Sequence, residues 1–203
     1  MTRPRAFASA LGALLLTASL VGCATTDAEP STAPPAATTD TAGGEVSETH
    51  NDADTSFAQM MIIHHEGAIE MAELAVDKAE APEVVALAER IAAAQGPEID
   101  EMTQWLGAWG EDVAASDHSG MSHGGMDMDG MSQEEMMEWL SGLSGDEFDT
   151  AFLEGMIAHH EGAVEMAEAE LDEGQNAEAL ALAEKIIADQ EAEIAEMKEM
   201  LGN

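Results

Sequence analysis

Apolar residues recur at helical spacing in four long stretches of the chain, and these stretches form two similar pairs. In residues 54–80 the apolar positions share one side of a helix turned by about 100° per residue, and acidic residues take the opposite side. Residues 82–106 carry a second stripe, beginning at Pro82, which a first helical turn tolerates. Residues 146–171 and 176–201 repeat both stripes. The pattern therefore predicts two helical hairpins.

The two hairpins are separated by a long connection. A shorter helix is expected within it over residues 132–143, capped by Ser132 and Glu135. Ser144 and Glu147 fit a second capping box at the entry to the third long helix. Aromatic and β-branched residues are sparse and Tyr is absent, so strands are not expected. Two antiparallel hairpins joined in this way predict an all-α four-helix bundle.

An internal repeat underlies the two hairpins. Residues 57–73 match residues 152–168 at 12 of 17 positions, and residues 87–106 match residues 182–201 at 11 of 20, both at an offset of 95. Such a repeat indicates that one helical hairpin was built twice. The expected division is repeat one over 54–107, a connection over 108–145 and repeat two over 146–203, together one bundle domain over 54–203.

Each repeat carries two adjacent histidines followed by glutamate, glycine and alanine. The first pair flanks the centre of its apolar stripe, so both imidazoles are expected to point into the bundle. These inward-facing histidines are His64, His65, His159 and His160. Glu66 and Glu161 fall away from the stripe and are expected to face solvent or to support the site from outside.

Polar residues also lie on the apolar stripe of the second helix in each repeat. They are Gln95, Glu98, Gln190 and Glu193. Buried amides and carboxylates cost free energy unless they are paired or bind something. Histidines on one helix and Gln/Glu on the next suit either a metal site whose ligands are held by hydrogen bonds or a closed hydrogen-bond network. Two matching sets favour the metal site over isolated core histidines and methionine filler.

The connection is rich in Gly, Ser, Asp, His and Met. Its possible ligands are His118, Met121, His123, Met126, Met128 and Met131. Thioether and imidazole donors suit soft ions such as Cu(I) or Ag(I), and the alternative is loose, oxidation-sensitive filler. Cys23 is the only cysteine, so soft-metal chemistry in the folded part must use Met and His.

The first 22 residues resemble an export signal. Two arginines precede a short apolar run that ends at Cys23, and the run is too short to span a membrane as a helix. The sequence Leu-Val-Gly-Cys also resembles a lipoprotein cleavage site, which predicts a lipid anchor on Cys23 and a protein at the outer face of the cytoplasmic membrane or in the periplasm or cell envelope. Residues 23–53 have few apolar side chains and are expected to form a disordered tether.

The charge of the chain limits its partners. The formal charge is −36, and removing residues 1–22 takes away two arginines and no acid, giving −38. Nucleic acid and anionic lipid headgroups are therefore disfavoured, whereas metal cations are attracted. A solvated acidic surface or adaptation to high salt explains the same charge without any ligand.

The repeated pattern of Met, paired His and a second Met, followed by Gln, Glu-Ile and Met, resembles the ferritin-like family called domain of unknown function 305. The resemblance covers residues 54–201 and implies an exported four-helix bundle associated with copper binding and resistance. The ligands that it implies are Met61, His64, His65, Met71, Met102, Met156, His159, His160, Met166 and Met197. Two departures, Gly155 in place of Met60 and the predicted kink at Gly96-Pro97, bear on whether the two sites are equivalent.

The function expected from these features is sequestration or buffering of copper without catalysis, with no organic cofactor. Cu(I) is the expected ion, Cu(II) and Ag(I) are alternatives, and a copper-handling protein is a candidate partner. A redox enzyme is disfavoured because di-iron bundles need a Glu three residues before a His, and those positions hold Met or Ile. A second alternative is an acidic helical interaction module that binds no metal.

Overall fold

A computed structural model of the protein describes residues 46–113 and 131–202. The proposed lipidation site Cys23 and most candidate ligands of the connection lie outside these ranges. Those ligands are His118, Met121, His123, Met126 and Met128.

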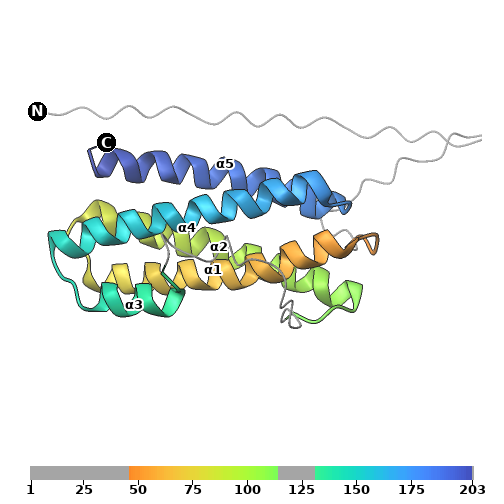
Figure 1. The fold of residues 1–203 in the computed structure, drawn as a ribbon, viewed down its shortest axis with the longest axis horizontal. Helices are drawn as coiled ribbons and strands as arrows, with labels where there is room; N and C mark the ends of the chain where they lie inside the picture. Colours follow the sequence, from red (N-terminus) through yellow and green to blue (C-terminus); the bar gives the residue numbers. More distant parts are fainter. Residues whose placement is uncertain (1–45, 114–130, 203) are drawn as a thin grey trace, which may run out of the picture. The chain divides into compact units, whose positions relative to one another are not determined.

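Every element within the described ranges is a helix, which confirms the all-α prediction (Figure 1). The elements are α1 (Asp52–Lys78), α2 (Pro82–Trp109), α3 (Gln133–Ser141), α4 (Asp146–Glu173) and α5 (Ala177–Met200). Helix α1 packs against α2 and α4 packs against α5, as the two predicted hairpins. The hairpins join through α1 and α4, and α3 lies against both of these helices. The packing is that of a helical bundle.

Side-chain caps account for several helix ends. Ser132 and Glu135 form the predicted capping box of α3. Asn51 and Asp54 form another at the start of α1, and the side chain of Asn176 caps α5. The box predicted for α4 from Ser144 and Glu147 is wrong. The residue that precedes α4 is Gly145, at φ 63°, and no side chain caps the helix there.

Helix α2 continues through Gly96-Pro97 to Trp109 without a break. Proline removes one backbone donor from a helix and disturbs the carbonyl four residues earlier. Both Pro97 and Ala93 are exposed, so this disturbance falls on the solvent side of α2.

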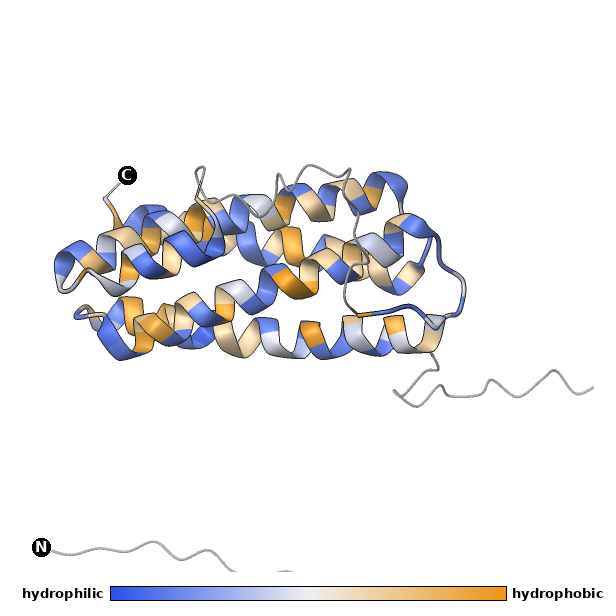
Figure 2. Cartoon of the chain, turned by 60° about the horizontal axis from the view of Figure 1, so that its bottom comes forward, coloured by the Kyte–Doolittle hydropathy of each residue, from blue (hydrophilic) through white to orange (hydrophobic). Residues whose placement is uncertain are grey.

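The apolar core has two parts, separated along α1 and α4. Hydrophobic and hydrophilic residues alternate along the helices (Figure 2). The α3-side cluster includes residues 68–75 of α1 and residues 148–156 of α4. The far-side cluster includes residues 57–62 of α1 and residues 163–167 of α4. The stretch of each helix that lies between the two clusters contains the paired histidines. No described helix has the length and hydropathy that a membrane span requires.

Candidate metal centre

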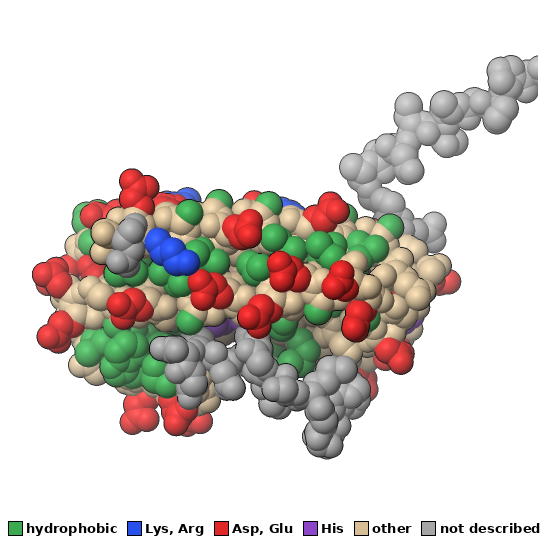
Figure 3. Space-filling model, turned by 45° about the horizontal axis from the view of Figure 1, so that its top comes forward, with side chains coloured by type: hydrophobic (Ala, Val, Ile, Leu, Met, Phe, Trp, Pro, Cys, Tyr) green, Lys and Arg blue, Asp and Glu red, His purple; other side chains and the backbone are tan. Residues whose placement is uncertain are grey.

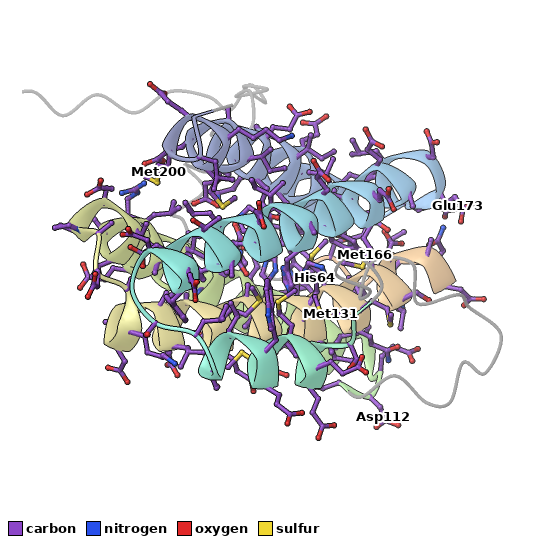
Figure 4. The ribbon with its side chains drawn as sticks, turned by 60° about the vertical axis from the view of Figure 1, so that its left-hand side comes forward. His64, Asp112, Met131, Met166, Glu173 and Met200 are labelled. Atoms are coloured by element: carbon purple, nitrogen blue, oxygen red, sulfur yellow. The ribbon has the colours of Figure 1, made fainter. Side chains whose placement is uncertain are left out.

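The two repeats meet at a pair of equivalent histidines. His64 of α1 and His159 of α4 are 3% and 4% exposed, and their ring centroids lie 3.7 Å apart at an interplanar angle of 44°. Figure 4 shows His64 within the bundle. The two residues differ by the repeat offset of 95, so they are equivalent positions of the two repeats. Their contact therefore lies at the interface between the two halves of the bundle.

The second histidine of each pair is fully buried and hydrogen bonds to the neighbouring helix. His65 Nε2 lies 2.8 Å from Glu98 Oε2. His160 Nε2 lies 2.8 Å from Glu193 Oε2. An ionised carboxylate only accepts hydrogen bonds, so Nε2 carries the hydrogen and the Nδ1 atom of a neutral ring keeps a lone pair. Neither of these Nδ1 atoms has a hydrogen-bond partner among the described residues.

Burial lowers the pKa of one histidine of the centre. It is the largest cause holding the pKa of His159 well below its usual 6.5, and repulsion by His64 and the other histidines adds to it. The His159 ring is therefore neutral at neutral pH, the form in which imidazole binds metals. Burial alone would raise the pKa of Glu98, but hydrogen bonds from His65 and Lys185 lower it overall and keep the carboxylate ionised.

The two His·Glu pairs are not equivalent. Lys185 of α5 donates to Glu98 at 2.7 Å and so joins the first pair. Its counterpart in the other repeat is Arg90, which donates to Glu196 at 2.6 Å instead. The side chain of Glu193 is 20% exposed and that of Glu98 is 10% exposed. The first pair is thus less exposed to solvent than the second, and its carboxylate accepts one more hydrogen bond.

Two glutamines complete the polar layer. Gln95 and Gln190 are 3% and 4% exposed, as expected from their place on the apolar stripe. The Oε1 atom of each has no hydrogen-bond partner in the described part of the chain. Glu66 and Glu161 are exposed, also as expected, and Glu161 pairs with Lys198 at 3.2 Å. Within residues 46–113 and 131–202, no group of three or more His, Cys, Asp or Glu is placed to hold one ion.

The candidate methionines are divided between the two core clusters. Met71, Met156 and Met197 are fully buried in the α3-side cluster. Met61 and Met102 are fully buried in the far-side cluster. Met166 is only half-buried against the far-side cluster, and Met131 packs at the edge of the α3-side cluster.

Met136 of α3 is a buried thioether that was not among the ligands predicted from the sequence. A Cβ atom added to Gly155 would lie 3.1 Å from Met136 Sδ and 3.4 Å from Met71 Cε, so glycine leaves room for a third helix to bring in a thioether. Met136 is 1% exposed. The signal available in the sequence was the spacing of Met136 and Leu140, four residues apart on the buried face of a short capped helix.

The fold and this polar layer define an all-helical bundle with paired, buried histidines between its two halves. The family described as a domain of unknown function (DUF305) matches residues 54–201, and the chain belongs to this family. No curated protein matches the chain.

Two groups of solved structures are similar. A DUF305 protein from Streptomyces coelicolor, provisionally described as secreted, is 31% identical over 74% of this chain and 92% of its own, with a TM-score of 0.67. The protein CopM in its Cu(I)-bound form is 35% identical over 74% of this chain and 96% of its own, with a TM-score of 0.61. CopM in its Cu(II)-bound form is 38% identical over 72% of this chain and 94% of its own, also with a TM-score of 0.61.

Proposed function

We propose that this protein binds copper outside the cytoplasm, through histidine and methionine side chains of the bundle, and buffers or passes on the ion without turning over a substrate. The observation that carries the proposal is the buried contact of His64 with His159, flanked by two His·Glu pairs. A carboxylate that accepts from one ring nitrogen fixes the orientation of the imidazole and makes the other nitrogen a better metal ligand. The similarity to CopM, described in Cu(I)-, Cu(II)- and Ag-bound forms, supports the same function.

The proposed ligands are the histidines of the polar layer and thioethers beside them. They are Met61, His64, His65, Met71, Met102, Met156, His159, His160, Met166 and Met197. Gln95, Glu98, Gln190 and Glu193 would hold these ligands in position. Thioether and neutral imidazole are soft or borderline donors, so Cu(I) is the preferred ion and Ag(I) its closest substitute.

We further propose that the protein is exported and attached to the outer face of the membrane by a lipid on Cys23. The similarity to a family member provisionally described as secreted supports export. The His- and Met-containing connection, with His118 and His123, would add weaker binding for the same ions, and a copper-handling protein would receive or supply them.

Titration of the metal-free protein with Cu(I) under reducing conditions tests the proposal. The wild type should bind copper, and replacing His64 and His159 together by Gln should weaken binding at least tenfold, since two ligands are removed. His50→Ala is the matched control, because His50 stacks on Trp109 at the start of the bundle, away from the polar layer. Far-ultraviolet circular dichroism shows whether each variant folds. Unchanged copper binding by a folded double variant would contradict the proposal.

A further inference from the structure

A groove with a volume of about 590 Å³ lies along the first half of α1 and the last half of α4. Its lining includes one methionine from each helix, Met60 and Met166, both of which are only half-buried. The methionines in the core clusters at Met61 and Met156 are fully buried. The groove is therefore lined by one half-buried methionine from each of two helices.

The internal repeat and the shared groove lining indicate that these two methionines lie near each other. Adding the offset of 95 pairs Met60 with Gly155 and Met71 with Met166. Met71 Cε lies 3.4 Å from the position of a Cβ on Gly155. The His65–Glu98 and His160–Glu193 distances are both 2.8 Å, so the two repeats pack alike there, and we expect the corresponding neighbours in the other half to be Met60 and Met166.

Helix α3 makes the two halves different. On the side of Gly155 it inserts Met136, whose Sδ and Cε lie 3.1 and 3.2 Å from the Cβ position, and it closes this region from solvent. Gln133 Nε2 donates to the backbone oxygen of Gly67 at 3.0 Å and fixes α3 there. No described helix covers the corresponding surface at Met60 and Met166, and this surface is the groove.

The charge around the groove favours cations. The acidic residues Asp52, Glu111 and Glu173 line it, and no Lys, Arg or His does so among the described residues. On the face of the bundle drawn in Figure 3, Asp and Glu side chains are spread with few basic side chains between them. Acidic walls raise the local concentration of cations, whereas thioethers select soft ions over Ca²⁺ or Mg²⁺.

We propose that Met60 and Met166 bind a soft monovalent cation, Cu(I) or Ag(I), in this groove, at a site separate from the buried histidines. The inference rests on the proposed function but assigns Met166 to this groove and not to the histidine centre. It adds a site at the surface that only one half of the bundle has. The ion would be held by two thioethers from facing helices, with the acidic wall supplying charge.

Silver(I) titration of the metal-free protein, followed by NMR of ¹³C-labelled methionine methyl groups, tests the site directly. The methyl resonances of Met60 and Met166 should shift together on addition of Ag(I). Met60→Leu and Met166→Leu should each lower the bound silver by one equivalent, because leucine keeps the volume and removes the sulfur. Met200→Leu, at the end of α5 and outside the groove lining, should change nothing.

The outcomes separate this site from the proposed function. The variant with Gln at positions 64 and 159 should lose silver at the histidines and still show the shifts of Met60 and Met166. Wild-type stoichiometry in folded Met60→Leu and Met166→Leu would overturn the groove site and leave the histidine centre standing. A wild type that binds neither silver nor copper would overturn both.

Discussion

Buried ionisable residues in this bundle take protonation states that neighbouring residues set. In the polar layer, burial keeps His159 neutral and hydrogen bonds keep Glu98 ionised. A second example joins the start of α1 to the end of α4. Asp54 accepts backbone N–H groups from Gln175 and Asn176 at 3.0 and 2.8 Å, and it lies against the buried Glu170.

The pair formed by Asp54 and Glu170 has one carboxylate and one neutral acid. Burial is the main cause that raises the pKa of Glu170 from 4.5 to about 8, and the adjacent Asp54 adds to the shift. Burial alone would raise the pKa of Asp54 as well, but hydrogen bonds from Glu170 and backbone N–H groups lower it overall. At neutral pH the protonated Glu170 therefore donates to the ionised Asp54.

This pair predicts a pH dependence of stability. Between pH 4.5 and about 8 the folded chain keeps a proton on Glu170 that the unfolded chain releases, so the contribution of Glu170 to stability should fall as pH rises. The slope for one proton is up to about 1.4 kcal/mol per pH unit. Urea unfolding of the metal-free protein should show this slope reduced in Glu170→Gln. The exposed Glu168→Gln is the control, and an equal slope in both variants would contradict the assignment.

At the scale of helices, α3 distinguishes the two halves of the molecule. It is only nine residues long, and such a short helix is unstable in isolation. Its capping box and the burial of Met136 and Leu140 hold it against α1 and α4. Lys78 makes two further contacts at this end of the bundle. Its Nζ lies 5.4 Å from the centroid of the Phe148 ring, as a cation over an aromatic ring, and it donates to the backbone oxygen of Ser141 at the end of α3.

The caps allow a paired test with two serines. Ser132→Ala removes the cap of α3 and should lower the stability of this helix by about 1 kcal/mol, because the backbone N–H of Glu135 loses its acceptor. Ser144→Ala should have an effect near zero, since Ser144 does not cap α4. Hydrogen exchange of α3 amides measures the first effect, and thermal unfolding compares the two. If Ser144→Ala lowered stability more than Ser132→Ala, the observed start of α4 at Asp146 would be contradicted.

At the scale of the whole molecule, the dominant feature is a negative charge of −36 on 203 residues. Only a few ion pairs offset it in the described ranges, and several of them are exposed, such as Arg90 with Glu196. Exposed pairs contribute little to stability, whereas repulsion among many like charges destabilises the compact state.

Salt should therefore stabilise this protein. Raising NaCl from about 10 mM to about 500 mM shortens the Debye length from roughly 30 Å to a few Å and screens the repulsion. We expect the melting temperature of the metal-free chain to rise by several °C, about 2–4 °C for each kcal/mol gained. Differential scanning calorimetry measures this change. A melting temperature that falls with salt would show that attractive ion pairs dominate instead.

Much of this protein follows from its sequence. The periodicity of apolar residues predicted the helices to within a few residues at each end, since each long helix must bury one face. The repeat predicted one histidine pair in each half of the bundle, and the position of the pairs on the stripe predicted their burial. These properties depend on residues close together along the chain, and local spacing is sufficient to determine them.

The tertiary structure alone decided which groups meet. Sequence spacing could not show that His64 contacts His159, that Glu98 accepts from His65 and also from Lys185 of another hairpin, or that Gly155 admits Met136. It also could not show that α3 closes one half and leaves a groove at Met60 and Met166 in the other. Such contacts depend on how helices pack across a long connection, because packing brings together residues that no local pattern relates.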